Sequence, residues 1–171
     1  MKEFQGNIKA EFDEINTTLN GIPQKIEDAK YIYQAAMYKY DGTGAINSGA
    51  TIPFTKEIYN TAGEKIVFNS DGTITINHTG FIKVSFGLWV HSSNVNARPW
   101  ARFRRKSDLF VFADALNDIS ANYVVIGVAN VIVPVAAGQI FDLSVNVNAG
   151  DTFKLDEGNG FKNSFITIEL L

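Results

Sequence analysis

The fold of this chain is decided by the stretch Gly72-Thr73-Ile74-Thr75-Ile76-Asn77-His78-Thr79-Gly80-Phe81-Ile82-Lys83-Val84-Ser85-Phe86. Apolar residues occupy alternate positions on both sides of a polar cluster, as Ile74 and Ile76 do before it. This period of two is typical of two half-buried β-strands joined by a turn. The stretch therefore predicts β-structure and excludes a helix.

The same period continues from Tyr31 to the end of the chain. Short runs of Ile, Val, Phe and Thr alternate with clusters of Gly, Asn, Asp and Ser, and no helical pattern lies between them. Strands at this spacing predict an all-β fold, a jelly-roll sandwich of antiparallel strands. We expect strands at Tyr31–Tyr40, Ile52–Tyr59, Gly72–Asn77, Phe81–His91, Trp100–Lys106, Tyr123–Val133, Gln139–Val147, Thr152–Leu155 and Ser164–Leu170.

The first thirty residues follow a different period. Apolar positions recur there at alternating steps of four and three, which is the heptad rhythm of helices that pack on one another. Isoleucine at both kinds of core position favours three or more helices. The alternative is one amphipathic helix that lies on its own domain. We predict a helical stem over residues 1–30 and a jelly-roll head over residues 31–171, with the stem core at Phe12, Ile15, Leu19, Ile22 and Ile26.

Composition limits the classes of function. The 171 residues include no cysteine, which excludes disulfides, a thiolate nucleophile, Cys-ligated zinc and iron–sulfur clusters. A net charge of −3 argues against non-specific binding of nucleic acid. The most apolar segment, residues 123–138, is too short to span a bilayer and contains Asn130 and Pro134, so we expect no membrane insertion. The first residues lack the pattern of a secretion signal, so we expect synthesis in the cytoplasm.

Four segments resemble, in order and spacing, the globular head of complement subcomponent one-q and its tumour-necrosis-factor relatives. They are Ile52–Asn60, Gly72–Ile76 followed by Gly80–Phe86, Ala137–Leu143 and Ser164–Leu170. The resemblance extends over residues 31–171 and implies a homotrimer around an axis lined by aromatic and aliphatic side chains. Large aromatic residues in the strands are therefore interpreted as core or trimer-interface residues: Tyr38, Phe86, Trp89, Phe141 and Phe165.

A trimeric head on a short helical stem, without cysteine or secretion signal, is similar to the fibre and receptor-binding proteins of bacteriophages. This resemblance implies a non-enzymatic structural protein of the virion, made in the host cytoplasm. Its N-terminal helix would bind another virion protein and its head would bind a host-surface glycan. Two alternatives remain open: a lectin-like cell-surface module of bacterial origin, and a glycan-cleaving enzyme.

Motifs for catalysis or metal binding are absent from the sequence. His78 and His91 do not stand at any ligand spacing, and there is no nucleophile elbow or phosphate-binding loop. We expect no catalytic residues, cofactor or metal. One connection gathers oxygen ligands that either hold calcium or are simply solvated, namely Asp108, Asp114, Asn117 and Asp118.

One basic cluster stands out, with Trp100 and Phe103 interleaved. On a strand, alternate residues from Trp100 onward point to the same side. The cluster is either a patch for an anionic glycan or phosphate-bearing polymer, or a charged outer strand paired with acids or a neighbouring subunit. Its cations are Arg98, Arg102, Arg104, Arg105 and Lys106.

Two long polar connections are the candidate receptor-binding loops, Ser92–Arg98 and Asp108–Asn122. Loops on a rigid scaffold are where binding residues usually lie. The candidate receptor-binding residues are Asn94, Asn96, Arg98, Trp100 and Asn117.

Overall fold

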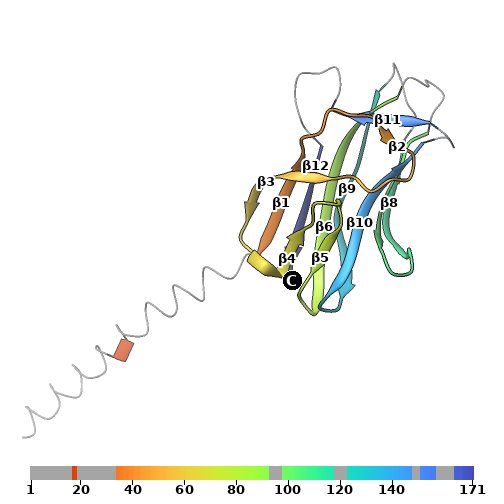
Figure 1. The fold of residues 1–171 in the computed structure, drawn as a ribbon. Coiled ribbons are helices and arrows are strands. Elements are labelled where there is room, and N and C mark those ends of the chain that lie inside the picture. The colour runs from red at the N-terminus through yellow and green to blue at the C-terminus, as the bar shows by residue number, and fades with distance from the viewer. Residues whose placement is uncertain (1–16, 19–33, 93–97, 118–122, 148–150, 157–163) are drawn as a thin grey trace, which may run out of the picture. The chain divides into compact units, whose positions relative to one another are not determined.

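The computed structural model describes residues 17–18, 34–92, 98–117, 123–147, 151–156 and 164–171 (Figure 1). The chain divides into two units, Met1–Tyr33 and Gln34–Leu171. Thr17 and Thr18 of the first unit are helical. Among the described residues, no helix has the length and apolar character needed to cross a bilayer. The predicted stem core lies outside the described residues: Phe12, Ile15, Leu19, Ile22 and Ile26.

The second unit is all-β, as the period of two predicted. Within its described residues it contains one short 3-10 turn, η1 (Gly63–Lys65), and strands β1 (Ala35–Tyr40), β2 (Ile46–Asn47), β3 (Phe54–Asn60), β4 (Ile66–Phe68), β5 (Ile74–Ile76), β6 (Gly80–His91), β7 (Trp100–Arg105), β8 (Val111–Leu116), β9 (Tyr123–Val135), β10 (Gln139–Asn146), β11 (Thr152–Leu155) and β12 (Phe165–Leu170).

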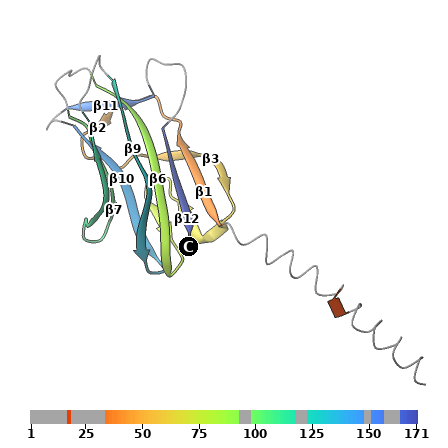
Figure 2. The same ribbon diagram turned by 180° about the vertical axis from the view of Figure 1, so that it is seen from behind.

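These strands form two antiparallel sheets that face each other (Figures 1 and 2). The first sheet has the order β2-β11-β6-β12-β1-β3, and β9 lies off this path and pairs with β6 from Gly80 to His91. The second sheet has the order β4-β5-β10-β7-β8. The chain crosses repeatedly between the two sheets, for example from β5 to β6 and from β9 to β10, as in a jelly roll.

The core lies between the sheets because each long strand alternates its apolar residues. In β6, the inward side chains from Ile82 to Val90 are at most 2% exposed, whereas the residues between them are partly exposed. They face Phe103 and Phe141 of the second sheet, whose rings stack at 5.3 Å. Burial of these aliphatic and aromatic surfaces is the main stabilising term of the head.

The turn before β5 depends on a glycine. Gly72 has a φ of +85°, and a Cβ at this position would lie 2.9 Å from the carbonyl oxygen of Ile52. The Asp71 side chain completes the turn by accepting a hydrogen bond from the Thr73 amide at 2.9 Å. Hydrogen bonds from the Thr73 hydroxyl and amide lower the pKa of Asp71. The turn fixes the start of β5.

The prediction of one long loop over Asp108–Asn122 is wrong, because residues 111–116 form strand β8 on the edge of the second sheet. Ala113 lies opposite Phe103 in the β7–β8 register and is buried. Asp108 closes the hairpin by accepting two hydrogen bonds from Arg105, at 3.0 and 2.6 Å. These hydrogen bonds lower the pKa of Asp108 to about 2.

The calcium interpretation of this connection fails for the same reason. Asp108 lies before β8 and Asn117 after it, so the strand separates the two proposed ligands. Among the described residues, no group of three or more His, Asp or Glu side chains is placed to hold a metal ion. Asp118 lies outside the described residues.

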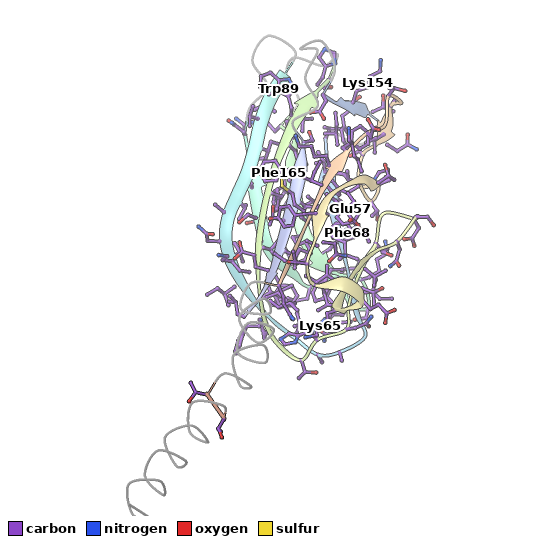
Figure 3. The ribbon with its side chains drawn as sticks, turned by 90° about the vertical axis from the view of Figure 1, so that its left-hand side faces the viewer. Glu57, Lys65, Phe68, Trp89, Lys154 and Phe165 are labelled. Atoms are coloured by element: carbon purple, nitrogen blue, oxygen red, sulfur yellow. The ribbon has the colours of Figure 1, made fainter. Side chains whose placement is uncertain are left out.

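Tyr38 of β1 closes one edge of the sandwich. Its ring stacks on Phe68 with centroids 3.9 Å apart, and its hydroxyl donates a hydrogen bond to Glu57 Oε2 at 2.5 Å. Figure 3 labels Glu57 and Phe68 on this edge of the head. Burial, followed by the hydrogen bond to the negatively charged Glu57, raises the pKa of Tyr38 to about 12.

This raised pKa predicts a loss of stability at alkaline pH. The neutral phenol is favoured in the folded state, so the contribution is complete below pH 10 and is lost as pH rises towards 12. Replacing Tyr38 by phenylalanine should flatten this part of the stability profile, measured by urea unfolding between pH 9 and 12 at steps of about half a unit. Glu57→Gln should shift the wild-type loss to lower pH. Identical profiles for all three proteins would contradict the assignment.

Candidate functional site

The outward surfaces of the two sheets differ in chemistry. On the first sheet, large apolar side chains project outward from β6, from β9 and from β12 with the residue that follows it. Four of them are strongly exposed, with exposed fractions of 53–60%, and two aromatic ones are partly buried. We name this surface the apolar face; its residues are Phe81, Trp89, Val125, Ile132, Phe165 and Leu171.

Strand register brings these side chains together. Trp89 pairs with Val125 across β6 and β9, and Phe165 pairs with Gly87 across β12 and β6. A Cβ at Gly87 would lie 2.8 Å from Cε1 of Phe165, so the ring lies over the backbone of β6. Figure 3 labels Trp89 and Phe165, which come from neighbouring strands.

A salt bridge is set into the apolar face. Lys83 Nζ lies 2.5 Å from Glu169 Oε2, and the two residues are direct partners in the β6–β12 register. Ile132 of β9 is the partner of Lys83 on the other side. The charges are thus paired with each other, and the polar pair Ser85–Thr167 separates them from Phe165. Apolar surfaces of this kind, with several large exposed side chains in neighbouring registers, mark sites of protein association.

The aromatic residues that the sequence proposed for core or interface fall into three places. Phe86 and Phe141 belong to the core, at 2% and 0% exposed. Tyr38 lies at the sandwich edge, packed on the core. Trp89 and Phe165 lie on the apolar face, which makes them the two of this set available to a partner subunit.

The outside of the second sheet bears a polar cluster centred on Asp142 of β10. The Asp142 carboxylate is fully buried and accepts hydrogen bonds from Arg104 Nε at 2.7 Å, Arg104 Nη2 at 3.1 Å, Thr51 Oγ1 at 2.8 Å and Lys106 Nζ at 3.1 Å. Burial opposes its ionisation, but the hydrogen bonds from these three residues outweigh burial and lower the pKa of Asp142. Two cations of the basic cluster are therefore structural.

The rest of the β7 surface is formed by Trp100 and Arg102, as the predicted alternation requires. Arg102 lies between Ser144 of β10 and Asp114 of β8, and Trp100 lies between Asn146 and Leu116. The Arg102 guanidinium carbon is 3.2 Å from the centroid of the Trp100 ring, so the two groups stack. We name this surface the Trp100 face; it consists of Trp100, Arg102, Asp114, Leu116, Ser144 and Asn146.

The predicted receptor-binding residues are only partly brought together. Trp100 belongs to the Trp100 face and is 37% exposed, and Arg98 is exposed two residues before it. Asn117 instead links chain segments, since its amide donates to the Pro99 carbonyl at 3.3 Å and its side chain donates to the Val125 carbonyl at 3.2 Å. Asn94 and Asn96 lie outside the described residues.

Sequence reasoning missed the contribution of β10 to this surface. The sequence did contain a signal for it, because polar residues alternate with buried apolar ones along β10: Asp142, Ser144 and Asn146. Their partners come from segments distant in sequence, so the pairing itself had no local signature. A separate surface pocket of about 340 Å³ lies beside Lys106 and Ile140. The ammonium group of Lys106 is already paired with Asp142.

Comparison with known proteins defines the fold class. No protein-family model and no curated sequence matches the chain. Among solved structures, the Eiger TNF of S. frugiperda is 17% identical, with a TM-score of 0.61 over 81% of this chain and 92% of that one. Murine APRIL at pH 5.0 is 9% identical, with a TM-score of 0.61 over 81% and 99%. The globular domain of zebrafish complement 1qA is 13% identical, with a TM-score of 0.52 over 80% and 94%.

These likenesses place the head in the jelly-roll fold shared by tumour-necrosis-factor and complement one-q domains. The fold predicted from the four sequence segments is thus confirmed. At 9–17% identity the likeness concerns the fold alone.

Proposed function

We propose that this chain is a non-enzymatic trimeric fibre or decoration protein of a bacteriophage virion, anchored by its N-terminal helix and bearing a head that attaches to host-surface glycans. The observation that carries the trimer is the apolar face. Phe81, Val125 and Ile132 are more than half exposed on a sheet whose other side is the core. A second and third copy of the head are the occupants that we propose for this face.

The N-terminal segment supports the same assembly. Its isoleucine-rich heptads favour three or more helices, which matches the symmetry proposed for the head. The absence of cysteine also fits, since a cysteine-free chain needs no oxidising compartment to fold. Such a protein can be assembled in the cytoplasm and become exposed only with the particle.

Electron microscopy tests the virion location. Antibodies raised against the full chain are expected to label purified particles of the phage that encodes it, at a fixed position on each particle. Unrelated phage particles are the control. Label confined to the surface of uninfected bacteria would support the lectin-like module and would contradict the virion proposal.

A further inference from the structure

Arg102 differs from the other cations of β7 and of the turn that follows it. Arg104 and Lys106 are bound to Asp142, and Arg105 is bound to Asp108. Within the described part of the chain, Arg102 has neither an ion pair nor a hydrogen bond, and its contact is the stacking on Trp100. The basic cluster is therefore mostly structural, and Arg102 is the cation on this strand whose donors remain for a ligand.

The stacking on Trp100 orients those donors. A guanidinium that lies flat on an indole ring directs its N–H groups outward in its own plane, where they match the two oxygens of an anionic group. The Nε atom of Arg102 is buried, while the residue as a whole is partly exposed. The ring of Trp100, which is 37% exposed, provides an aromatic surface beside them.

Polar atoms without partners lie next to Arg102. In the described residues, Arg102 Nε, Ser144 Oγ and Asn146 Nδ2 are buried and make no hydrogen bond. Ser144, which is 0% exposed, is the direct partner of Arg102 in the β7–β10 register, and Asn146 is the partner of Trp100. Two residues before Ser144 in β10, the oxygens of Asp142 accept four hydrogen bonds. A buried polar group without a hydrogen bond lowers stability, so such groups often mark a binding site. All three atoms here can donate a hydrogen bond to a ligand.

We infer that the Trp100 face binds an acidic sugar of a surface glycan, with its single negative charge against the edge of Arg102 and its ring beside Trp100. The acidic group is a carboxylate or a phosphodiester, which share this recognition chemistry. Asp114 lies opposite Arg102, so the face has one cation and one acid and favours a singly charged group over a polyanion. This inference rests on the proposed function and names the ligand class of its head.

Calorimetric titration of the full chain tests the inference with three probes: a neutral hexose tetrasaccharide, the same tetrasaccharide with one hexuronic acid residue, and the same tetrasaccharide with one glycerol phosphodiester group. At least one acidic probe should bind ten times more tightly than the neutral one. Arg102→Gln should abolish this preference, and Arg102→Lys should retain part of it, because lysine keeps the charge without the planar fork. Lys56→Gln, which removes an exposed charge on β3, is the matched control and should bind as the wild type does.

Each outcome is decisive when folding is checked by circular dichroism. Preference for the hexuronate probe identifies a carboxylate, and preference for the glycerol phosphodiester probe identifies a phosphodiester. Equal binding of acidic and neutral probes, or an unchanged preference in Arg102→Gln, would overturn the inference. If Arg102→Gln does not fold, Arg102→Lys and Trp100→Phe provide the same comparison. If the wild-type chain shows no preference for the acidic probes but the virions are labelled, only the sugar site is rejected. If the Arg102-dependent preference is found but the virions are not labelled, only the virion location is rejected.

Discussion

Replacing Asp142 by asparagine is expected to lower the free energy of unfolding by about 3–5 kcal/mol, the usual effect of removing one partner of a buried ion pair. The Asp142 side chain is 0% exposed and that of Arg104 is 15% exposed, so the substitution leaves a largely buried guanidinium without its acid. Thr51 and Lys106 lose an ionised acceptor as well. Urea unfolding at a fixed protein concentration, followed by circular dichroism, measures the change.

Asp108→Asn is the matched control for this prediction. Its ion pair with Arg105 has a similar geometry, but the Asp108 side chain is 48% exposed. Exposed pairs contribute little to stability because water and salt screen them, so this substitution should have a much smaller effect. Equal effects of the two substitutions would show that burial of Asp142 does not decide its importance.

Acid should also remove the stabilising effect of Asp142 from the wild-type protein. The pKa of Asp142 is lower in the folded state than its usual 3.8, so its stabilising effect is present above pH 4 and is lost as pH falls below that value. Asp142→Asn should lack this contribution, and its stability should fall less steeply between pH 5 and 2.

Placing a carboxylate on the apolar face by Ile132→Glu is expected to convert the proposed trimer into monomers. Ile132 is 60% exposed in the single chain, so the substitution should leave the fold intact. In the assembly, each copy of the glutamate would be desolvated beside Lys83, whose ammonium group is already paired with Glu169. We expect at least a hundredfold weaker association, or about 3 kcal/mol.

The control for this prediction is Ile140→Glu on the second sheet. Ile140 is 43% exposed and is not part of the apolar face, so this variant should assemble as the wild type does. Analytical ultracentrifugation of both variants at micromolar concentration makes the comparison. Dissociation of both, or of neither, would contradict the assignment of the interface to the apolar face.

The strands that are long and alternate strictly could be predicted from the sequence. β6 is the clearest case, because five apolar residues at alternate positions define its buried side and Gly80 marks its start. β8 was missed since Asp114 and the neighbouring Asp108 suggested a loop. Edge strands bury few side chains, so their apolar pattern is weak, and Ala113 is too small to reveal it.

The basic cluster shows where sequence reasoning stops. Alternation along β7 correctly placed Trp100, Arg102 and Arg104 on one side, because strand geometry alone sets it. Which cations have acid partners depends on β10 and on Thr51, and Thr51 lies 91 residues from Asp142 in the chain. In the folded structure, Arg104, Arg105 and Lys106 each have an acidic partner. Among the described residues, Arg102 has none, and the sequence alone could not show this.

The mass of the full chain in solution tests the proposed trimer most directly. Native mass spectrometry and light scattering at micromolar concentration should give about 56 kDa, three times the chain mass of 18.8 kDa. The value should stay constant over a tenfold dilution, as expected for an association through large apolar surfaces. A stable species of 18.8 kDa under these conditions would contradict the trimeric head and, with it, the role proposed for the apolar face.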